Sequence, residues 1–206
     1  MGRPGLNRGD VVAAAADLAD EIGFDAVTIS VLARHLGVRS PTLYSHLSGA
    51  ADLRTAVTAY VLDELADVTS AAMSAGESRD LLAAYANAIR DFARRSPGRY
   101  DATTRQRIPP APGAASGSVD EAIAAGRRNA DLALAVVRSY GIPEPSETYA
   151  VRLMSSIVHG YITLELAGSF AHSEPPSANT WPEVLEELDR SLVRLASNAD
   201  TARPVR

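Results

Sequence analysis

The chain has 206 residues, of which 46% are hydrophobic, and its formal net charge is -5. This length and apolar content suit one substantial helical core with a small appended domain, and they exclude an intrinsically disordered protein. The absence of cysteine excludes disulfides, thiol nucleophiles and cysteine zinc sites. All 20 basic residues are arginines, which also excludes Schiff-base chemistry and a P-loop lysine.

The amino terminus predicts a short arm followed by a first helix. Arg3 is flanked by glycine and proline, so it either enters a minor groove of DNA or belongs to a disordered tail. Asn7 can cap the start of a helix, and the Asp10 side chain can bond back to the backbone of Asn7 as in a capping box. We expect this helix to run to Ile22 and to end at Gly23. The chain lacks the long apolar core of a signal peptide and any membrane-spanning stretch, so we expect a cytoplasmic protein.

Residues 28–47 spell two short helices joined by a turn. Thr28 can cap the first, whose residues Ile29, Leu32, Ala33 and Leu36 share one face. Gly37 can adopt the left-handed conformation of a sharp turn. Ser40 and Pro41 are expected to cap and begin the second helix, with Leu43 and Leu47 on its buried side. This is the layout of a DNA-reading helix-turn-helix, and the alternative is an ordinary helical hairpin.

The stretch from Asn7 to Val57 resembles the amino-terminal domain of TetR-family transcriptional regulators. The similarity lies in T-I-S-V-L-A-R-H-L-G-V and in S-P-T-L-Y-S-H-L followed by A-D-L. It implies a homodimer whose recognition helices enter successive major grooves of a palindromic operator, and a carboxy-terminal domain that binds a small effector. The expected DNA-binding residues are Arg3, Thr28, Arg39, Ser40, Pro41, Thr42, Tyr44, Ser45 and His46.

Two features count against strong DNA binding. Ala50 occupies the place where family members commonly carry a lysine that touches a phosphate. Affinity should then rest on Arg39, Thr42, Tyr44 and His46, with a shallow dependence on salt. Residues 1–54 also hold five arginines against six acidic residues, so the domain is not basic on average.

The rest of the chain predicts a helical bundle. We expect a connector helix over 51–75, a helix over 79–95 ended by residues 96–98, and either a short helix or a loop over 99–107. A flexible linker is expected over 108–118. Ser118 and Glu121 form a capping box for a helix to Tyr140.

The last two helices are expected at about 146–168 and 182–198. The first carries a broad apolar arc, and around His159 and Gly160 it resembles the penultimate helix of one TetR carboxy-terminal subclass. Together, from two subunits, they would form a four-helix interface. The expected interface residues are His159, Gly160, Thr163, Val184, Leu188 and Leu192. His159 is either an interface residue or an effector ligand.

An effector pocket would be apolar with a few polar groups, although residues at this spacing can equally be ordinary core. The expected lining is Tyr85, Ile89, Phe92, Tyr100, Met154, Ile157, Val158 and Tyr161. The four histidines lack the paired spacing of a metal site, and no cofactor is expected.

The sequence as a whole predicts an all-α protein of about nine helices. Residues 1–50 are expected to form a three-helix DNA-binding domain, and 51–206 an effector-binding and dimerisation domain. The predicted function is that of a transcriptional repressor released from its operator by a small, largely apolar effector. The alternative is a dimeric interaction module with weak or lost DNA binding. An enzyme is not expected, because the common nucleophile, phosphate-binding and metalloprotease motifs are missing.

Overall fold

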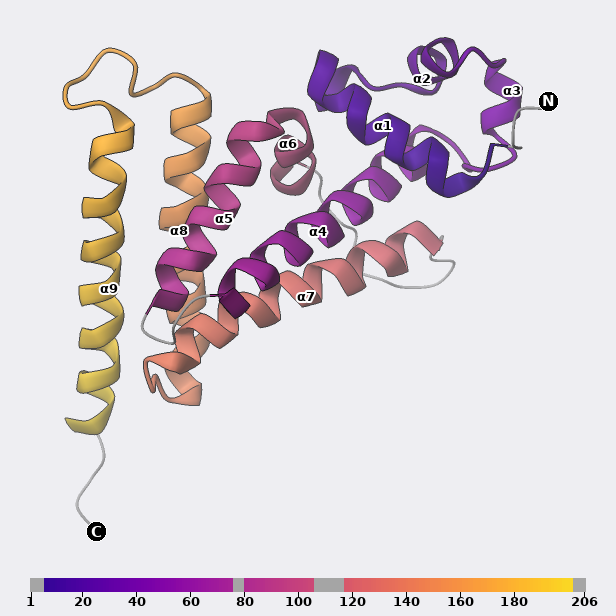
Figure 1. Cartoon of the computed structure of the whole chain (residues 1–206). Coiled ribbons are helices and arrows are strands. Elements are labelled where there is room, and N and C mark those ends of the chain that lie inside the picture. Colours follow the sequence, from indigo (N-terminus) through magenta and orange to yellow (C-terminus); the bar gives the residue numbers. More distant parts are fainter. Residues whose placement is uncertain (1–5, 76–79, 106–116, 202–206) are drawn as a thin grey trace. The chain divides into compact units, whose positions relative to one another are not determined.

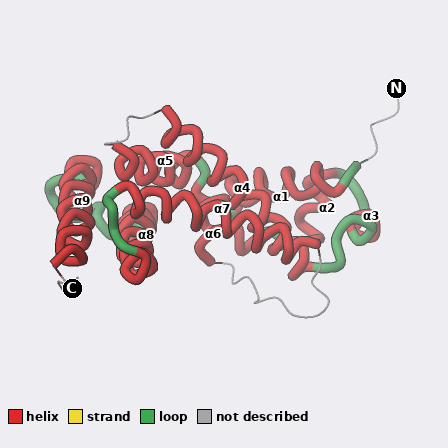
Figure 2. Tube along the Cα trace, turned by 90° about the horizontal axis from the view of Figure 1, so that it is seen from below, coloured by secondary structure: helices red, strands yellow, loops and turns green. Residues whose placement is uncertain are grey.

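The described part of the computed structural model is entirely helical, as predicted. It comprises residues 6–75, 80–105 and 117–201, in which Figure 2 shows helices and loops only. The elements are α1 (Arg8–Ile22), the 3-10 helix η1 (Phe24–Ala26), α2 (Ile29–Leu36), α3 (Ser40–Leu43), α4 (Ala50–Ala75), α5 (Leu81–Arg95), α6 (Pro97–Arg105), α7 (Gly117–Ser139), α8 (Glu144–Leu166) and α9 (Ser177–Thr201). None of these helices combines the length and apolarity needed to cross a membrane.

The chain divides into two compact units that do not follow its linear order. Unit 1 comprises residues 1–67 and 95–129, and unit 2 comprises residues 68–94 and 130–206. The expected division at residue 50 cuts across this arrangement, because α6 and the first half of α7 belong to the unit that contains the helix-turn-helix. In sequence, α4 and α7 each begin in unit 1 and end in unit 2.

Unit 1 is built around α1. The predicted capping box is present: the Asn7 side chain accepts from the Asp10 amide, and the Asp10 carboxylate accepts from the Asn7 amide. The helix ends at Gly23, whose φ of 84° favours glycine. Its apolar face, Val11, Ala15, Leu18 and Ala19, is buried. Both α2 and α6 contact this helix, and α3 packs on α2 (Figure 1).

The short helix α6 shows that residues 99–105 are helical, while residues 106 and 107 lie outside the described part of the chain. The first residue of α6 is Pro97. Proline suits this position because the amide hydrogen that it lacks would be unpaired in the first helical turn anyway. Gly98 makes the close contact with α1: a Cβ there would lie 1.8 Å from the carbonyl oxygen of Ala19. Thr58 of α4 donates to the carbonyl of Ala102, which fixes α6 to a third helix.

Unit 2 contains α5, α8, α9 and the second half of α7. The predicted apolar side of α5 is buried at Leu82, Tyr85, Ile89 and Phe92. The buried stripe of α8 is narrower than predicted, with Ala150, Met154, Val158 and Ile162 at every fourth position. On α9, Trp181, Leu188 and Leu192 are buried.

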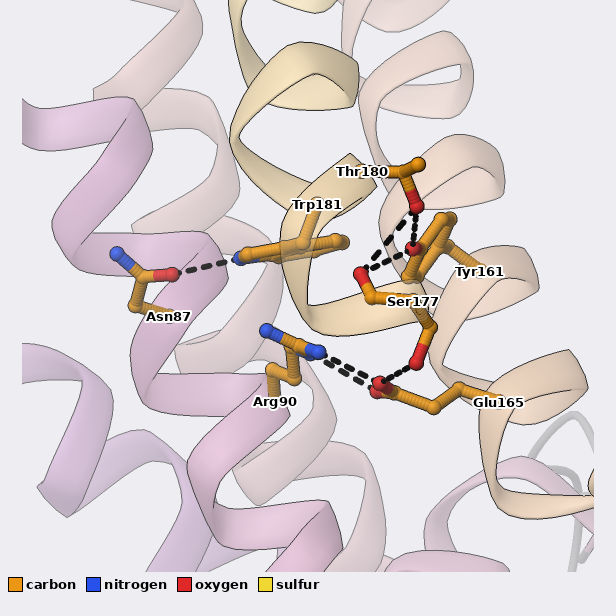
Figure 3. Close-up of polar contacts among 7 residues, drawn as sticks. All are labelled: Asn87, Arg90, Tyr161, Glu165, Ser177, Thr180 and Trp181. Carbon is orange, nitrogen blue, oxygen red and sulfur yellow. Dashed lines mark hydrogen bonds and ion pairs between the residues drawn. The ribbon is translucent and has the colours of Figure 1, made fainter. Parts of the chain in front are cut away.

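A polar network joins α5, α8 and α9 inside unit 2 (Figure 3). Arg90 of α5 makes two hydrogen bonds to the carboxylate of Glu165, which also accepts from the Ser177 hydroxyl at 2.7 Å. The hydrogen bond from Arg90 lowers the pKa of Glu165, so the carboxylate stays ionised although half-buried. Trp181 donates to Asn87 at 2.7 Å. Removal of one partner would leave a buried group unpaired, so the network fixes the register of the three helices.

Three predicted boundaries were wrong. Ser118 does not cap α7: the helix begins at Gly117, and the Ser118 hydroxyl bonds to Asp52 and Arg8 instead. The last helix begins at Ser177, so Pro182 lies inside it rather than at its start. Ser40 was predicted to cap α3, but it is the first residue of that helix. The N-cap is Arg39, whose side chain makes no capping hydrogen bond. The predicted linker over 108–118 lies largely outside the described residues.

Candidate nucleic-acid interface

The turn of the helix-turn-helix has the geometry that its sequence predicts. Thr28 accepts from the amide of Val31, and Gly37 ends α2 in the left-handed conformation with φ 68° and ψ 30°. The amide of Val38 then donates a hydrogen bond to the carbonyl of Ala33 at 2.9 Å. The buried Ala33 side chain is small enough for α2 and α3 to cross closely. The direction of the recognition segment is therefore fixed by local interactions.

We define the recognition segment as residues 39–46. Its regular helix is short, because after Leu43 the chain continues as turns in which the amides of His46 and Leu47 both bond to the Leu43 carbonyl. The Ser45 hydroxyl donates to the carbonyl of Thr42 at 2.6 Å. These bonds keep the polar side chains on one face although the α-helix has ended.

The recognition segment has a buried side and an exposed side. Leu43 is 0% exposed and Leu47 is 2% exposed, whereas Tyr44 is 58% exposed. The other expected DNA-binding residues that are exposed are Thr28, Arg39, Pro41, Thr42 and Ser45, and Ser40 and His46 are half-buried. Arg3 lies outside the described residues. A protruding tyrosine among hydroxyl groups and an arginine can contact base edges and phosphates.

The acidic residues that weakened the case for DNA binding are largely occupied elsewhere. Arg99 of α6 forms ion pairs with Asp17 at 2.6 Å and Asp20 at 3.3 Å on α1. Arg54 pairs with Asp25 at 3.0 Å. The one guanidinium of Arg99 also faces Glu64 at 3.3 Å, so these ion pairs offset part of the negative charge, and the carboxylates repel phosphate less than the residue count suggests.

Arg8 and Asp52 connect the two ends of the helix-turn-helix domain to α7. Arg8, at the start of α1, donates to the carboxylate of Glu121 at 2.8 Å and to the hydroxyl of Ser118 at 2.7 Å. The Ser118 hydroxyl donates to Asp52, whose other oxygen accepts from the amide of Ser48 at 2.8 Å. Burial acts to raise the pKa of Asp52, but the hydrogen bonds from Ser118 and Ser48 and the charge of Arg8 outweigh it and lower the pKa.

Sequence reasoning missed the interactions of Arg8, Arg99 and Ser118. The guanidinium of Arg8 is held by α7, a contact that the sequence did not predict. The partners lie 113 residues apart for Arg8 and Glu121, and 66 apart for Ser118 and Asp52. No local pattern could have revealed pairs at such separations, because capping and periodicity rules relate only residues within a few positions.

Comparisons with known proteins match both parts of the chain. Residues 11–57 match the model for bacterial regulatory proteins of the tetR family, and residues 82–188 match the tetracyclin repressor-like C-terminal domain. An uncharacterised helix-turn-helix transcriptional regulator of Mycobacterium tuberculosis is 35% identical over 164 residues, 79% of this chain and 72% of that protein. The class D tetracycline repressor of Escherichia coli is 40% identical over 73 residues, which are 35% of this chain and 33% of the repressor.

The chain belongs to the TetR family. Its function is therefore that of a DNA-binding transcriptional regulator. Among solved structures, BioQ with its double-stranded DNA operator covers 92% of this chain and 99% of its own, with a TM-score of 0.62 and 21% identity. A Rhodococcus protein of unknown function has a TM-score of 0.70 and 23% identity, covering 93% of this chain and 96% of its own. These two structures share the fold of this TetR-family chain.

The expected effector pocket of this TetR-family chain is divided between the units. Tyr100 belongs to α6 of unit 1, and the other seven expected residues belong to α5 and α8 of unit 2. Tyr85 is buried and bonded to Ser155, and its burial raises its pKa to about 12, so the phenol stays protonated. Tyr161 donates to the carbonyl of Ser177 at 2.6 Å. The phenols of Tyr85 and Tyr161 are thus already hydrogen-bonded in the protein.

The expected interface residues divide by exposure. Leu188 and Leu192 are buried within a single chain, so their side chains are not available to a second subunit. His159, Gly160 and Val184 are half-buried, and Thr163 is exposed. Sequence reasoning did not assign Leu164 and Val193 to the interface, although they are 47% and 49% exposed. Periodicity identified the apolar stripe of each helix but not which of its members a single chain covers.

Proposed function

We propose that this TetR-family chain is a repressor that binds a palindromic operator as a homodimer through the recognition segment, residues 39–46. One observation carries the proposal: the segment buries Leu43 and Leu47 while presenting Tyr44 and Arg39 to solvent. A segment held rigidly by its apolar side with its polar side exposed is what major-groove binding requires. We further propose that the protein acts on DNA in the cytoplasm by binding, without catalysing a reaction.

A mobility-shift experiment tests DNA binding by this segment. The DNA upstream of the protein's own gene serves as the probe, and Tyr44→Ala is compared with Tyr149→Ala, since both tyrosines are 58% exposed. We expect wild type and Tyr149→Ala to retard the probe equally, and Tyr44→Ala to lose the specific shift. Equal binding by both variants would contradict the role of the segment, and no shift by wild type at low salt would favour an interaction module.

The proposed homodimer uses exposed residues of α8 and α9. Leu164 and Leu166 of α8 and Val193 of α9 are large apolar side chains left exposed in the single chain, and Thr163, next to Leu164, is also exposed. Covering such side chains contributes favourable free energy to association. Light scattering at micromolar concentration tests the assembly, and a monomeric mass would contradict it.

The proposed effector binds within the carboxy-terminal domain and favours the arrangement that does not bind DNA. An effector with equal affinity for both arrangements would shift nothing, so it must bind this one more tightly. A small, largely apolar molecule with one or two polar groups suits a domain rich in buried aliphatic and aromatic side chains. Helices α4 and α7, which run from one unit into the other, are the proposed route of coupling.

A further inference from the structure

A continuous set of hydrogen bonds runs from α7 to the loop that follows the recognition segment, all of it within unit 1. It begins at Glu121, passes through Arg8 and Ser118 to Asp52, and ends at the amide of Ser48. Ser48 lies two residues after His46. The first turn of α7, although 70 residues further along the chain, is therefore connected to the backbone that follows the recognition segment.

Ser118 is the central member of this set. It is 2% exposed, and its hydroxyl accepts from the Arg8 guanidinium while it donates to the Asp52 carboxylate at 2.5 Å. Both partners are charged, and hydrogen bonds to charged groups are stronger than those between neutral groups. Removal of the hydroxyl would leave one bonding position of each charged group unfilled in a partly buried site.

The residues of this set also line a hollow beside the recognition segment. A hollow of about 530 Å³ is lined by Tyr44, Ser45 and His46 of the recognition segment and by Gly117, Ser118 and Glu121 of α7. Arg8, Leu47, Ser48 and Asp52 complete its lining. The recognition segment and the first turn of α7 therefore face the same hollow, and the hydrogen bonds of Ser118 lie at its wall.

We propose that Ser118 and Glu121 are positioning residues for DNA binding, which hold the recognition segment through Arg8, Asp52 and Ser48. In this account Arg8 is held by the protein and does not contact phosphate. Asp52 orients the loop after the segment because its two oxygens bond to different elements, Ser48 before α4 and Ser118 on α7. This inference rests on the proposed DNA binding by the recognition segment.

Ser118→Ala tests the proposal without a change of charge. The matched control is Ser139→Ala, which removes a hydroxyl that bonds within α7 itself. Operator affinity and affinity for an unrelated duplex are measured at a temperature where circular dichroism shows each variant folded. We expect the ratio of the two affinities to fall by about threefold to tenfold for Ser118→Ala and to be unchanged for Ser139→Ala. A merely structural loss of folded protein would lower both affinities equally and leave the ratio unchanged, which would overturn the proposal.

Glu121→Gln distinguishes positioning from competition with DNA for Arg8. Its control is Asp120→Asn, which removes the same charge from an exposed neighbour on the same turn. If Glu121 positions the segment, Glu121→Gln binds the operator more weakly than Asp120→Asn. If Glu121 instead withholds Arg8 from a phosphate, Glu121→Gln binds more tightly than Asp120→Asn, and the proposal is overturned. Failure of the wild type to bind any upstream fragment would instead count against the proposed function.

Discussion

At the scale of single residues, we expect the side chain at the start of α4 to influence how strongly the protein contacts phosphate. Ala50 is exposed at the first residue of α4, where the family commonly carries a lysine. The missing charge lowers the number of counterions that binding releases, so the salt dependence of operator affinity should be shallow.

Ala50→Lys should restore such a contact. We expect tighter operator binding and a slope of log affinity against log salt that is steeper by about 0.9, the value for one added phosphate contact. Binding is measured by fluorescence anisotropy over a salt series. Thr148→Lys adds the same charge at an exposed position of α8 in unit 2 and should leave the slope unchanged. An Ala50→Lys slope equal to that of wild type would show that this position does not face phosphate.

His159 gives the protein a pH-dependent stability. Burial lowers the pKa of its imidazole below the ordinary value of 6.5, so the folded protein favours the neutral ring. The unfolded chain binds a proton at higher pH than the folded chain does. The free energy of unfolding is therefore highest above pH 6.5, where the ring is neutral in both states. It falls as the pH drops through and below 6.5, because the unfolded chain then takes up a proton that the folded chain disfavours.

Urea denaturation from pH 7.5 to 5.5 checks this dependence. The free energy of unfolding of the wild type should fall as the pH decreases, and His159→Gln should reduce that fall. His172→Gln, which changes an exposed histidine, should leave the pH profile unchanged. A His159→Gln profile parallel to the wild type would exclude a contribution from this residue.

At the scale of elements, the sequence predicted helices where the determinants are local. The box of Asn7 and Asp10, the cap at Thr28 and the glycines 23 and 37 lie within or beside the helices they delimit, and their predicted roles are confirmed. Errors arose where a polar residue had a distant partner. Ser118 satisfied a capping rule in the sequence, but Asp52 and Arg8 compete for its hydroxyl in the structure.

In the candidate site, too, the sequence predicted the features set by neighbouring residues but not those set by distant partners. The exposed side of the recognition segment follows from the positions of Leu43 and Leu47, four residues apart on a helix. The ion pairs of Asp17 and Asp20 with Arg99 did not follow, because their separation of about 80 residues is closed only by the packing of α6 on α1. The net charge of a linear segment was therefore a poor measure of the surface it forms.

The packing of α6 on α1 depends on the absence of a side chain at Gly98. In Gly98→Ala the added methyl group would meet the backbone of Ala19, which cannot move as a flexible side chain can. We expect the free energy of unfolding to fall by about 1–3 kcal/mol. Gly126→Ala, inside α7 with open space around the new methyl group, should instead raise it by about 0.5–1 kcal/mol. Thermal denaturation measures both, and a Gly98→Ala protein as stable as wild type would contradict this contact.

For the whole molecule, the account requires two recognition segments acting together. A single segment with few phosphate contacts would bind weakly, whereas two segments joined by a dimer bind with a high effective concentration. The apolar side chains of α8 and α9 that remain exposed in one chain provide the proposed means of joining them.

A hydroxyl-radical footprint of the intact protein on the DNA upstream of its gene tests this requirement most directly. We expect two protected half-sites of inverted sequence on one face of the duplex, centred about 34 Å apart or a multiple of that distance. Tyr44→Ala should remove protection from both half-sites together, and Tyr149→Ala should retain it. A single protected half-site, or protection that survives Tyr44→Ala, would contradict operator binding by a dimer through residues 39–46.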